Sequence, residues 1–329
     1  MKTLLYYDVK KMGIENREIP QPNDHEVLVR VKACGVCGTD VHIFNGMPGS
    51  AEVTPPIVLG HEFAGEVVQI GRSVKTLSIN DRVAIDPNIY CGICEYCRSG
   101  KKHLCNHLEA IGVTRDGGMA EYCIVPENQC IKVSDELSYY EAAMIEPLSC
   151  VLHGIELLSI KSESEILIIG GGFIGSMFLQ MMKQTSKRVD IVEIDESKHL
   201  ALSQYKPRTI LKDLQHVEAS YDIIIECVGK AITVEMGIKK AKKGAQILLF
   251  GVANPNALIQ ISPYEIFQKE LNIIGSFINP DTVCTAEKLL SDRIIDVEGL
   301  ISHKLSLEEV PNTLLNYPSL KINKAVIYF

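Results

Sequence analysis

Four cysteines lie close together in the stretch CGICEYCRSGKKHLC, at positions Cys91, Cys94, Cys97 and Cys105. Thiols at such spacings could form disulfides, take part in redox chemistry or bind a metal ion. Two consecutive Cys-x-x-Cys spacings let backbone turns wrap one tetrahedral ion, and a fourth thiolate can return from the loop that follows. The pattern therefore predicts a structural zinc, with disulfide pairing or unconnected free thiols as the alternatives. Because four protein thiolates leave no open position for a substrate, any reaction must take place elsewhere.

The composition bounds the compartment and the partners. The chain has 329 residues, enough for two domains, and its 46% hydrophobic and 22% charged residues are typical of soluble globular proteins. MKTLLYYDVKK reaches Asp8 before an apolar core of signal-peptide length forms, and no apolar run could span a bilayer. We expect a cytoplasmic protein whose eleven cysteines form no disulfide framework. A net charge of −8 without a basic block argues against nucleic-acid and membrane partners.

A second motif follows the apolar run EILII. Gly170, Gly172 and Gly175 form a GxGxxG loop, with Phe173 and Ile174 between the last two glycines. The loop follows a predicted strand and opens a predicted helix, which is the context of a dinucleotide-binding fold. The first glycine makes the tight turn, the second lets the backbone approach a pyrophosphate, and the third allows close helix–strand packing. The helix amino terminus then faces the phosphates, so we expect all five residues at the cofactor.

An acidic residue follows the loop at a distance suited to this fold. Asp195 lies 20 residues beyond Gly175, at the end of VDIVEID, and we predict that it accepts hydrogen bonds from the adenosine ribose. A carboxylate there repels a 2′-phosphate, so the sequence favours NAD over NADP. Lys198 could reach the same ribose or be a solvated helix lysine. For the motif as a whole, the alternative is a glycine-rich turn in an unrelated sheet.

These motifs lie in two halves with different patterns. From about residue 20 to 150 the chain reads as short strands and turns, such as EVLVRVKACGVCG, EFAGEVVQIG, DRVAI and EYCIVP. From about residue 163, apolar strands such as DIIIECVG and AQILLFG alternate with helix-like segments. That alternation predicts an α/β fold with a parallel sheet covered on both faces. In the last 45 or so residues we expect one helix, TAEKLLSDR, and a final strand, KAVIYF, returning to the first domain.

Three further stretches carry candidate metal ligands: GVCGTDVHIFNG, LGHEFAGEVVQIGRSV and MIEPLSCVLHG. The second reads G-H-E-x2-G-x5-G-x2-V from Gly60 to Val74, which resembles the signature of zinc-dependent medium-chain alcohol dehydrogenases. The C-G-T-D-x-H of the first stretch and the four-cysteine lobe resemble the same family, over nearly the whole chain. DPNIYCG and IEPLS are most similar to its polyol dehydrogenase branch, which includes sorbitol, xylitol and galactitol-phosphate dehydrogenases.

The resemblance implies a division into domains. Residues 1–150 and 282–329 would form a GroES-like β-rich catalytic domain with the zinc lobe at about 88–108, and residues 151–281 a Rossmann NAD-binding domain with a doubly wound sheet. The segment between Asp195 and Asp222 is short for the family, so we expect a trimmed third βα unit. Since dimers and tetramers are common in the family, we expect a homo-oligomer.

The resemblance also implies a catalytic zinc, so we expect two zinc ions per chain. Cys37 and His61 are its expected ligands, with a buried thiol and a core histidine as the alternatives. In the polyol branch the Glu beside the histidine binds zinc, and the later Glu approaches the metal directly or through water. Glu62 and Glu146 occupy these positions, and which of them is the direct third ligand stays open. Glu62 could also act only through a hydrogen bond near the metal.

Chemistry independently favours such a site for an alcohol substrate. A zinc with an open position lowers the pKa of a bound alcohol as it does that of water, and the nicotinamide accepts the hydride. Thr39 could then pass the substrate proton through the nicotinamide ribose to His42 and solvent, since the family uses a Ser or Thr and a His at these positions. For His42 the alternative is a plain surface imidazole.

We therefore expect a zinc-dependent oxidoreductase that transfers a hydride between a secondary alcohol and NAD. The small-molecule substrate would be a polyol, a polyol phosphate or a sugar acid. Animal sorbitol dehydrogenases carry a polyol-binding arginine where this chain has Ile278, which argues against free sorbitol. The alternatives are an enzyme like L-threonine 3-dehydrogenase and an inactive zinc-stabilised binding protein of the same fold.

Overall fold

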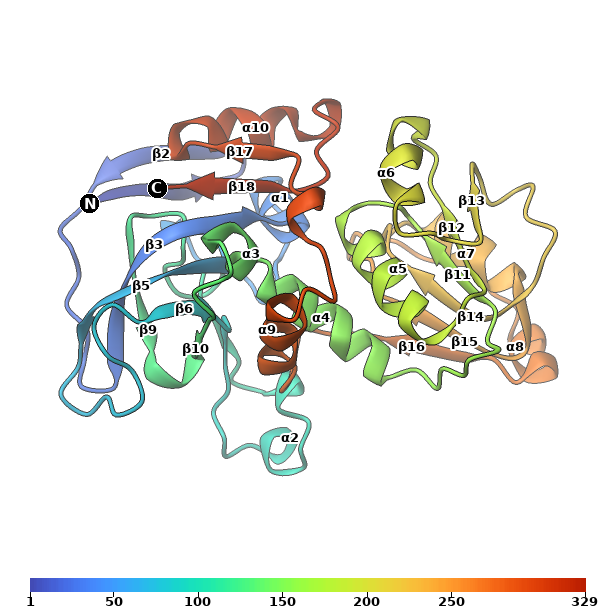
Figure 1. The fold of residues 1–329 in the computed structure, drawn as a ribbon, viewed down its shortest axis with the longest axis horizontal. Helices are drawn as coiled ribbons and strands as arrows, with labels where there is room; N and C mark the ends of the chain where they lie inside the picture. Colours follow the sequence, from blue (N-terminus) through green and yellow to red (C-terminus); the bar gives the residue numbers. More distant parts are fainter. The chain divides into compact units, whose positions relative to one another are not determined.

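The computed structural model describes residues 1–329, which separate into two compact units (Figure 1). The first unit comprises Met1–Ser149 and Ile278–Phe329, and the second comprises Cys150–Phe277. The first crossing between units therefore falls inside one helix, α4 (Ile145–Glu156). None of the helices combines the length and the apolar character that crossing a bilayer requires.

The first unit is rich in short strands, as its strand-like runs and turns predict. Its strands are β1 (Lys2–Asp8), β2 (Lys11–Asn16), β3 (Glu26–Val36), β4 (Ile57–Val58), β5 (Glu62–Ile70), β6 (Arg82–Ile85), β7 (Asn88–Ile89), β8 (Glu109–Ala110), β9 (Tyr122–Pro126), β10 (Cys130–Lys132), β17 (His303–Leu305) and β18 (Ala325–Tyr328). They form a seven-stranded sheet in the order β10-β6-β5-β3-β18-β17 with β9 on β3, and two small sheets, β2-β1-β4 and β7-β8.

The helices of this unit are short and lie between strands or after the return of the chain. They are α1 (Gly38–Phe44), α2 (Glu95–Arg98), α3 (Tyr139–Ala143), α9 (Val283–Ser291) and α10 (Val310–Asn316), with 3-10 turns η1 (Lys102–Leu104), η2 (Glu127–Gln129), η4 (Glu298–Leu300), η5 (Leu307–Glu309) and η6 (Tyr317–Ser319). The predicted helix at TAEKLLSDR is α9. The expectation of one helix there was incomplete, because the seven-residue α10 carries Pro311 in its first turn and reads as a loop in sequence.

β3 is the central strand of the first unit. Val27, Val29 and Val31 alternate along it and are buried, which gives the sheet its apolar inner face. Its pairings are antiparallel, with β5 along one edge, and with β9 and then β18 along the other. Two registers matter for the site: Gly35 pairs with Glu62, and Val36 pairs with Ala325.

The second unit is a six-stranded parallel sheet with helices between the strands. Its strands are β11 (Ile166–Ile169), β12 (Val189–Val192), β13 (Thr209–Leu211), β14 (Tyr221–Glu226), β15 (Ala241–Leu249) and β16 (Asn272–Gly275). Its helices are α5 (Phe173–Thr185), α6 (His199–Ser203), α7 (Ala231–Lys239), α8 (Pro263–Lys269) and the 3-10 turn η3 (Glu196–Lys198).

The strand order is β13-β12-β11-β14-β15-β16. The chain adds β12 and β13 on one side of β11 and then β14, β15 and β16 on the other side, as in a doubly wound dinucleotide fold. Right-handed crossovers therefore put α5 and α6 on one face of the sheet and α7 and α8 on the other (Figure 1). All four residues of β11 are buried, which explains its continuous apolar run. The predicted trimmed third unit is confirmed: α6 has five residues and β13 has three.

Candidate functional site: a metal cluster, a cysteine lobe and a glycine loop

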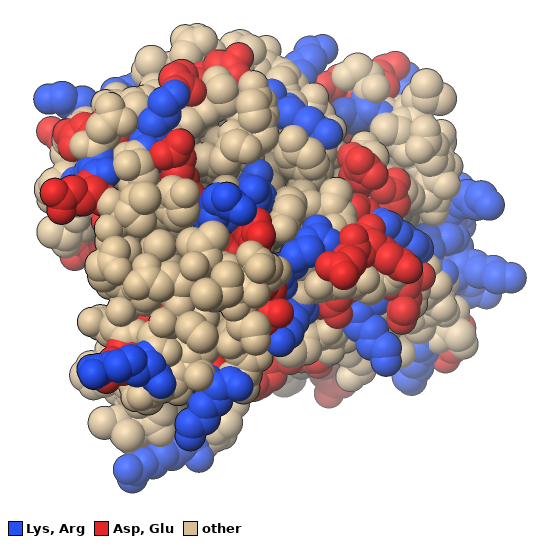
Figure 2. Space-filling view, turned by 60° about the vertical axis from the view of Figure 1, so that its left-hand side comes forward, with Lys and Arg blue, Asp and Glu red and all other residues tan.

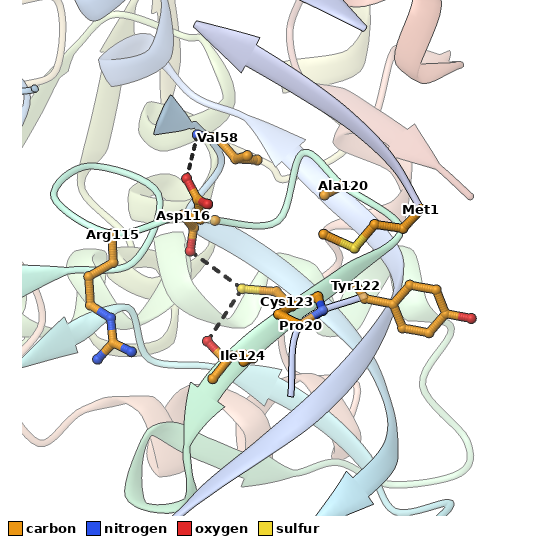
Figure 3. A pocket seen from close by; sticks show the side chains of 10 residues that line it. Met1, Pro20, Val58, Arg115, Asp116, Ala120, Tyr122, Cys123 and Ile124 are labelled. Atoms are coloured by element: carbon orange, nitrogen blue, oxygen red, sulfur yellow. Dashed lines mark hydrogen bonds between the residues drawn. The ribbon is translucent and has the colours of Figure 1, made fainter. Parts of the chain in front are cut away.

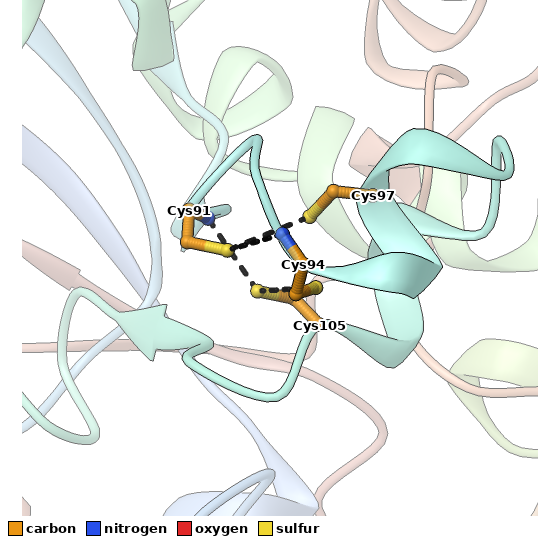
Figure 4. A group of neighbouring side chains, drawn as sticks. All are labelled: Cys91, Cys94, Cys97 and Cys105. Atoms are coloured by element: carbon orange, nitrogen blue, oxygen red, sulfur yellow. Dashed lines mark hydrogen bonds between the residues drawn. The ribbon is translucent and has the colours of Figure 1, made fainter.

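The four cysteines of the lobe converge on one point (Figure 4). Their sulfur atoms all lie within 4.8 Å of one another; Cys91 and Cys97 are 4.0 Å apart, and Cys94 and Cys105 are 3.9 Å apart. A tetrahedral ion with Zn–S bonds of about 2.3 Å needs sulfur separations of about 3.8 Å. The arrangement therefore fits a zinc ion held by four thiolates.

The backbone of the lobe also favours thiolates. The N–H groups of Cys91 and His107 donate to Cys105 Sγ at 3.4 and 3.3 Å, and that of Cys94 donates to Cys91 Sγ at 3.4 Å. Such donors lower the pKa of Cys91. No cysteine of the chain forms a disulfide, so that alternative for the lobe does not occur here.

A second group of ligand atoms lies where β3 and β5 meet. Cys37 directly follows β3 and His61 directly precedes β5, so the Gly35–Glu62 pairing places both at one edge of the sheet. The ligand atoms of Cys37, His61 and Glu62 lie within 4.8 Å of one another. His61 and Glu62 are 8% and 1% exposed, so little water competes for these atoms.

Negative charge accumulates around His61. Asp40 Oδ2 accepts a hydrogen bond from the Cys37 N–H at 2.8 Å, while Asp40 Oδ1 lies 3.8 Å from His61 Nδ1. Burial lowers the pKa of His61, but the hydrogen bond with Cys37 and the charges of Asp40, Cys37 and Glu146 outweigh it and raise the pKa well above its usual value. His61 Nδ1 and Asp40 Oδ1 are buried without a hydrogen-bond partner. A cysteine sulfur, an imidazole and nearby carboxylates suit a divalent metal ion.

One cation already lies at this group. Lys324 Nζ donates to Glu62 Oε2, and both side chains are almost fully buried. Lys324 immediately precedes β18, and the Val36–Ala325 pairing brings it beside the end of β3. The sequence does not indicate Lys324, because this residue is 262 residues from Glu62 along the chain. The negative charge of Glu62 raises the pKa of Lys324 against the effect of burial, so the ammonium stays charged.

The other candidate residues lie around this group. Glu146, in the first turn of α4, is buried and close enough to raise the pKa of His61, but it is outside the group of three ligand atoms. Thr39 and His42 are both half-buried on α1, three residues apart on the same side of the helix. Burial lowers the pKa of His42. The two side chains do not hydrogen-bond to each other, so a proton relay through them needs a bridging hydroxyl.

The glycine loop has the geometry that a pyrophosphate needs. Gly170 has a φ of +101°, a backbone conformation that residues other than glycine rarely adopt. A Cβ on Gly175 would lie 1.8 Å from Gly170 O, so only glycine lets α5 begin this close to β11. A Cβ on Gly172 would meet nothing within 4 Å, which leaves this face open to a ligand at the start of α5. Phe173 is buried and Ile174 half-buried, so these two offer backbone N–H groups rather than side chains.

The acidic residue that reaches this loop is Glu193. It directly follows β12, and its Oε2 accepts from the Gly171 N–H at 3.0 Å. Asp195, which the sequence analysis placed at the ribose, instead accepts at Oδ1 from the N–H and hydroxyl of Ser197 and caps η3. Lys198 Nζ lies 3.9 Å from Glu193 Oε2. Counting residues from the glycine loop led to Asp195, whereas the first residue after β12 is Glu193.

A cavity of about 150 Å³ in the first unit lies away from these groups (Figure 3). Its polar lining is internally satisfied: Arg115 donates to Glu26, Asp116 accepts from the Val58 N–H, and Cys123 donates to the Asp116 carbonyl. None of the predicted ligands lines it. The cavity therefore contributes none of the predicted metal ligands or catalytic side chains.

A β-rich unit with a Cys–His–Glu cluster, joined to a doubly wound nucleotide-binding unit, defines a metal-dependent dehydrogenase. Residues 23–135 match the family described as "Alcohol dehydrogenase GroES-like domain", and residues 174–292 match "Zinc-binding dehydrogenase". The chain belongs to the zinc-binding alcohol dehydrogenase family. It is therefore an oxidoreductase acting on an alcohol with zinc and a nicotinamide cofactor. These matches confirm the fold class, the GroES-like and Rossmann domains and the family predicted from sequence.

Similar proteins confirm the predicted polyol branch. D-arabinitol dehydrogenase 1 of Uromyces fabae is 31% identical, over 95% of this chain and 93% of that protein. L-idonate 5-dehydrogenase of Vitis vinifera is 30% identical, over 92% of this chain and 86% of that protein. The crystal structure of a zinc-binding dehydrogenase from Sinorhizobium meliloti bound to NADP has a TM-score of 0.95 and 34% identity, and the match covers 100% of this chain and 99% of that one.

Proposed function

We propose that this enzyme reversibly oxidises a secondary hydroxyl of a polyol, a polyol phosphate or a sugar acid to a ketone, with NAD as acceptor. The observation that carries the proposal is the Cys37–His61–Glu62 group at the edge of the sheet in the first unit, in which His61 and Glu62 are buried and Cys37 is half-buried. Relatives named for D-arabinitol and L-idonate support a polyol or a sugar acid as substrate.

We assign Cys37 and His61 as ligands of the catalytic zinc, with Glu62 or Glu146 completing the set directly or through water. When bound, zinc lowers the pKa of the substrate hydroxyl, and the nicotinamide accepts the hydride. Asp40 accepts from the Cys37 N–H and lies beside His61, so it holds the Cys37 backbone close to the imidazole. Thr39 and His42 would carry the substrate proton towards solvent, and a hydroxyl of the cofactor ribose would bridge the two side chains.

For the cofactor, we assign the backbone of Gly170 to Gly175 to the pyrophosphate and Glu193 to the adenosine ribose. The Glu193 carboxylate already accepts from the loop at 3.0 Å and would repel a 2′-phosphate, which favours NAD. The similar Sinorhizobium meliloti structure holds NADP, so the cofactor preference needs its own measurement. We assign Lys198, near Glu193, to the edge of the same ribose site.

The four-cysteine lobe would carry a second, structural zinc, giving two ions per chain. The free thiols in the structure are compatible with a reducing compartment, and we propose a cytoplasmic location. Basic and acidic side chains are mixed on the face shown in Figure 2, without a continuous basic stripe, which supports a small-molecule substrate rather than nucleic acid. We further propose that residues 1–150 and 282–329 act as the catalytic domain and residues 151–281 as the NAD domain.

A homo-oligomer, dimeric or tetrameric, is the remaining proposal. β16 is an edge strand of the parallel sheet, and Leu258, Tyr264 and Phe267 are 86%, 65% and 78% exposed in the segments before it. Exposed aromatic groups near an open strand edge suit a second copy of the same chain.

The substrate class is tested by NADH formation with zinc-loaded protein and a panel of free polyols, polyol phosphates, aldonates and L-threonine. We expect turnover with one of the first three classes and little with free sorbitol, because Ile278 occupies the position of the polyol-binding arginine. Turnover of L-threonine alone would move the enzyme to the threonine dehydrogenases. No NADH formation with any substrate of the panel, with zinc and NAD both bound, would favour an inactive binding protein.

A further inference from the structure

Five buried polar side chains connect three parts of the first unit. They come from β7 and η2 beside the cysteine lobe, from the return segment after Phe277, and from the first turns of α4. Each is at most 5% exposed: Asn88, Gln129, Ser149, Asn279 and Thr282. Buried polar groups at this depth are costly unless each is satisfied, so their arrangement is specific.

The hydrogen bonds among them run in one direction. Gln129 Nε2 donates to the Asn88 carbonyl at 2.6 Å, and Asn88 Nδ2 donates to Asn279 Oδ1 at 2.6 Å. Asn279 Nδ2 donates to Ser149 Oγ at 2.7 Å, and Ser149 Oγ donates to the Glu146 carbonyl at 2.5 Å. Asn279 thus joins the strand that leads into the cysteine lobe to the backbone of a candidate metal ligand.

The return segment is held in an unusual conformation. Ile278 and Asp281 have φ of +48° and +61°, values that a β-branched residue in particular rarely adopts. Thr282 Oγ1 donates to the Ser149 carbonyl at 2.7 Å, and Lys102 of the lobe donates to Asp281 at 2.5 Å. The segment is therefore fixed on one side by the lobe and on the other by α4.

This support reaches the first turn of α4. The Glu146 carbonyl accepts from Ser149 Oγ, and Ser149 Oγ in turn accepts from Asn279 Nδ2. The Asn279 amide accepts from Asn88 and donates to Ser149, whereas an ionised aspartate at this position can only accept and would lose the second bond.

We propose that Asn279 is a positioning residue that fixes Glu146 at the catalytic metal and couples it to the cysteine lobe. The inference rests on the proposed function, because it takes the carboxylate of Glu146 as a metal-directed group. Asn279 touches neither metal nor substrate and acts through Ser149 and the first turn of α4.

The test compares Asn279→Asp with Thr282→Val in protein carrying Co²⁺ at the Cys37–His61 site and zinc in the lobe. The visible absorption of Co²⁺ reports the geometry of its ligands, and the thermal midpoint reports folding. We expect Asn279→Asp to shift the Co²⁺ bands and to lower kcat about tenfold to a hundredfold with the KM for NAD unchanged. Thr282→Val, which loses a bond of the same segment to Ser149 but keeps the Asn279 link, should leave the bands in place. Ser149→Ala is the second variant and should shift the bands in the same way if Asn279→Asp folds poorly.

Unchanged bands and kcat in a folded Asn279→Asp protein, or equal band shifts in Thr282→Val, would overturn the inference. The wild-type spectrum separates this result from a failure of the proposed function. A wild-type protein that takes up no Co²⁺ outside the lobe would lack the catalytic metal site and overturn both proposals.

Discussion

At the scale of single residues, Glu62 is the ligand candidate whose role depends on a neighbour. Its carboxylate lies between the Cys37–His61 pair and the Lys324 ammonium. A buried carboxylate needs a partner cation, and here both a metal ion and a lysine can provide one. A stronger ion pair between Lys324 and Glu62 leaves the third coordination position of the metal to Glu146 or to a water molecule.

Lys324→Met tests this competition through stability. In the zinc-free protein the change leaves Glu62 buried and unpaired, so we expect the free energy of unfolding to fall by about 3 kcal/mol. In the zinc-loaded protein the metal supplies the missing positive charge, and the loss should be clearly smaller. Urea titrations with and without zinc measure both values.

Lys304→Met provides the matched control. Lys304 lies over the Tyr140 ring at the surface, so its loss should cost less than about 1 kcal/mol with or without zinc. If Lys324→Met lowers the free energy of unfolding equally with and without zinc, the catalytic metal does not compensate the negative charge of Glu62.

The preference for NAD over NADP tests whether Glu193 or Asp195 contacts the adenosine ribose. Glu193→Gln removes the negative charge beside the glycine loop, so we expect the ratio of kcat/KM for NAD to that for NADP to fall about tenfold. Asp195→Asn should change this ratio less than twofold, because its carboxylate caps η3. Steady-state kinetics with both cofactors measures the ratios, and a larger effect at Asp195 would return the ribose contact to that residue.

At the scale of elements, strand register creates the metal site. β5 and β18 both pair with β3 at its carboxyl end, so Cys37, His61 and Lys324 meet although they come from distant parts of the sequence. Sequence predicted β3 and β5 from their strand-like runs. The C-G-T-D-x-H stretch indicated Cys37, and the G-H-E motif indicated His61. The sequence could not predict Lys324 at this site, because the strand-like run KAVIYF does not indicate which strand it pairs with. The same limit applies to Asn279, whose partners depend on where the chain returns after the second unit.

The glycine loop was predictable because its constraints are local. Two substitutions separate its packing role from its binding role. Gly172→Ala adds a methyl group in open space and should change stability by less than about 1 kcal/mol, while weakening NAD binding at least about tenfold because the methyl blocks the phosphate. Thermal unfolding and NAD titration measure the two effects.

Gly175→Ala should behave differently, since its Cβ would lie 1.8 Å from Gly170 O and force α5 away from the loop. We expect it to lose about 1–3 kcal/mol of stability as well as NAD affinity. Equal stability losses for the two variants would contradict the open face assigned to Gly172.

At the scale of the whole molecule, the proposed function divides the tasks among two metal sites and a nucleotide-binding unit. The cysteine lobe predicts a metal that supports the fold rather than the reaction. Cys97→Ser should reduce the zinc content from about two to about one per chain and lower the thermal midpoint, because a ligand of the lobe is lost. Cys284→Ser, at an exposed thiol outside both sites, should change neither. Metal analysis that finds two ions in Cys97→Ser would remove the lobe assignment.

Assembly can be tested on the exposed face of the second unit. Light scattering of the wild-type protein should give a mass at least twice the 36.4 kDa of one chain. Phe267→Asp adds a charge to a side chain that is 78% exposed in this structure and should shift the mass towards one chain if the face is an interface. A wild-type mass of one chain would rule out the proposed oligomer.

The assignment of the reaction to the Cys37–His61 site is tested most directly by the rate of NADH formation, measured with the best substrate of the panel for zinc-loaded wild-type protein and for Cys37→Ala. We predict that Cys37→Ala keeps the lobe zinc, the thermal transition and NAD binding but loses turnover by at least about a thousandfold, since the metal that activates the alcohol is no longer held. Undiminished turnover in a folded Cys37→Ala protein would contradict the assignment of the reaction to the Cys37–His61 site.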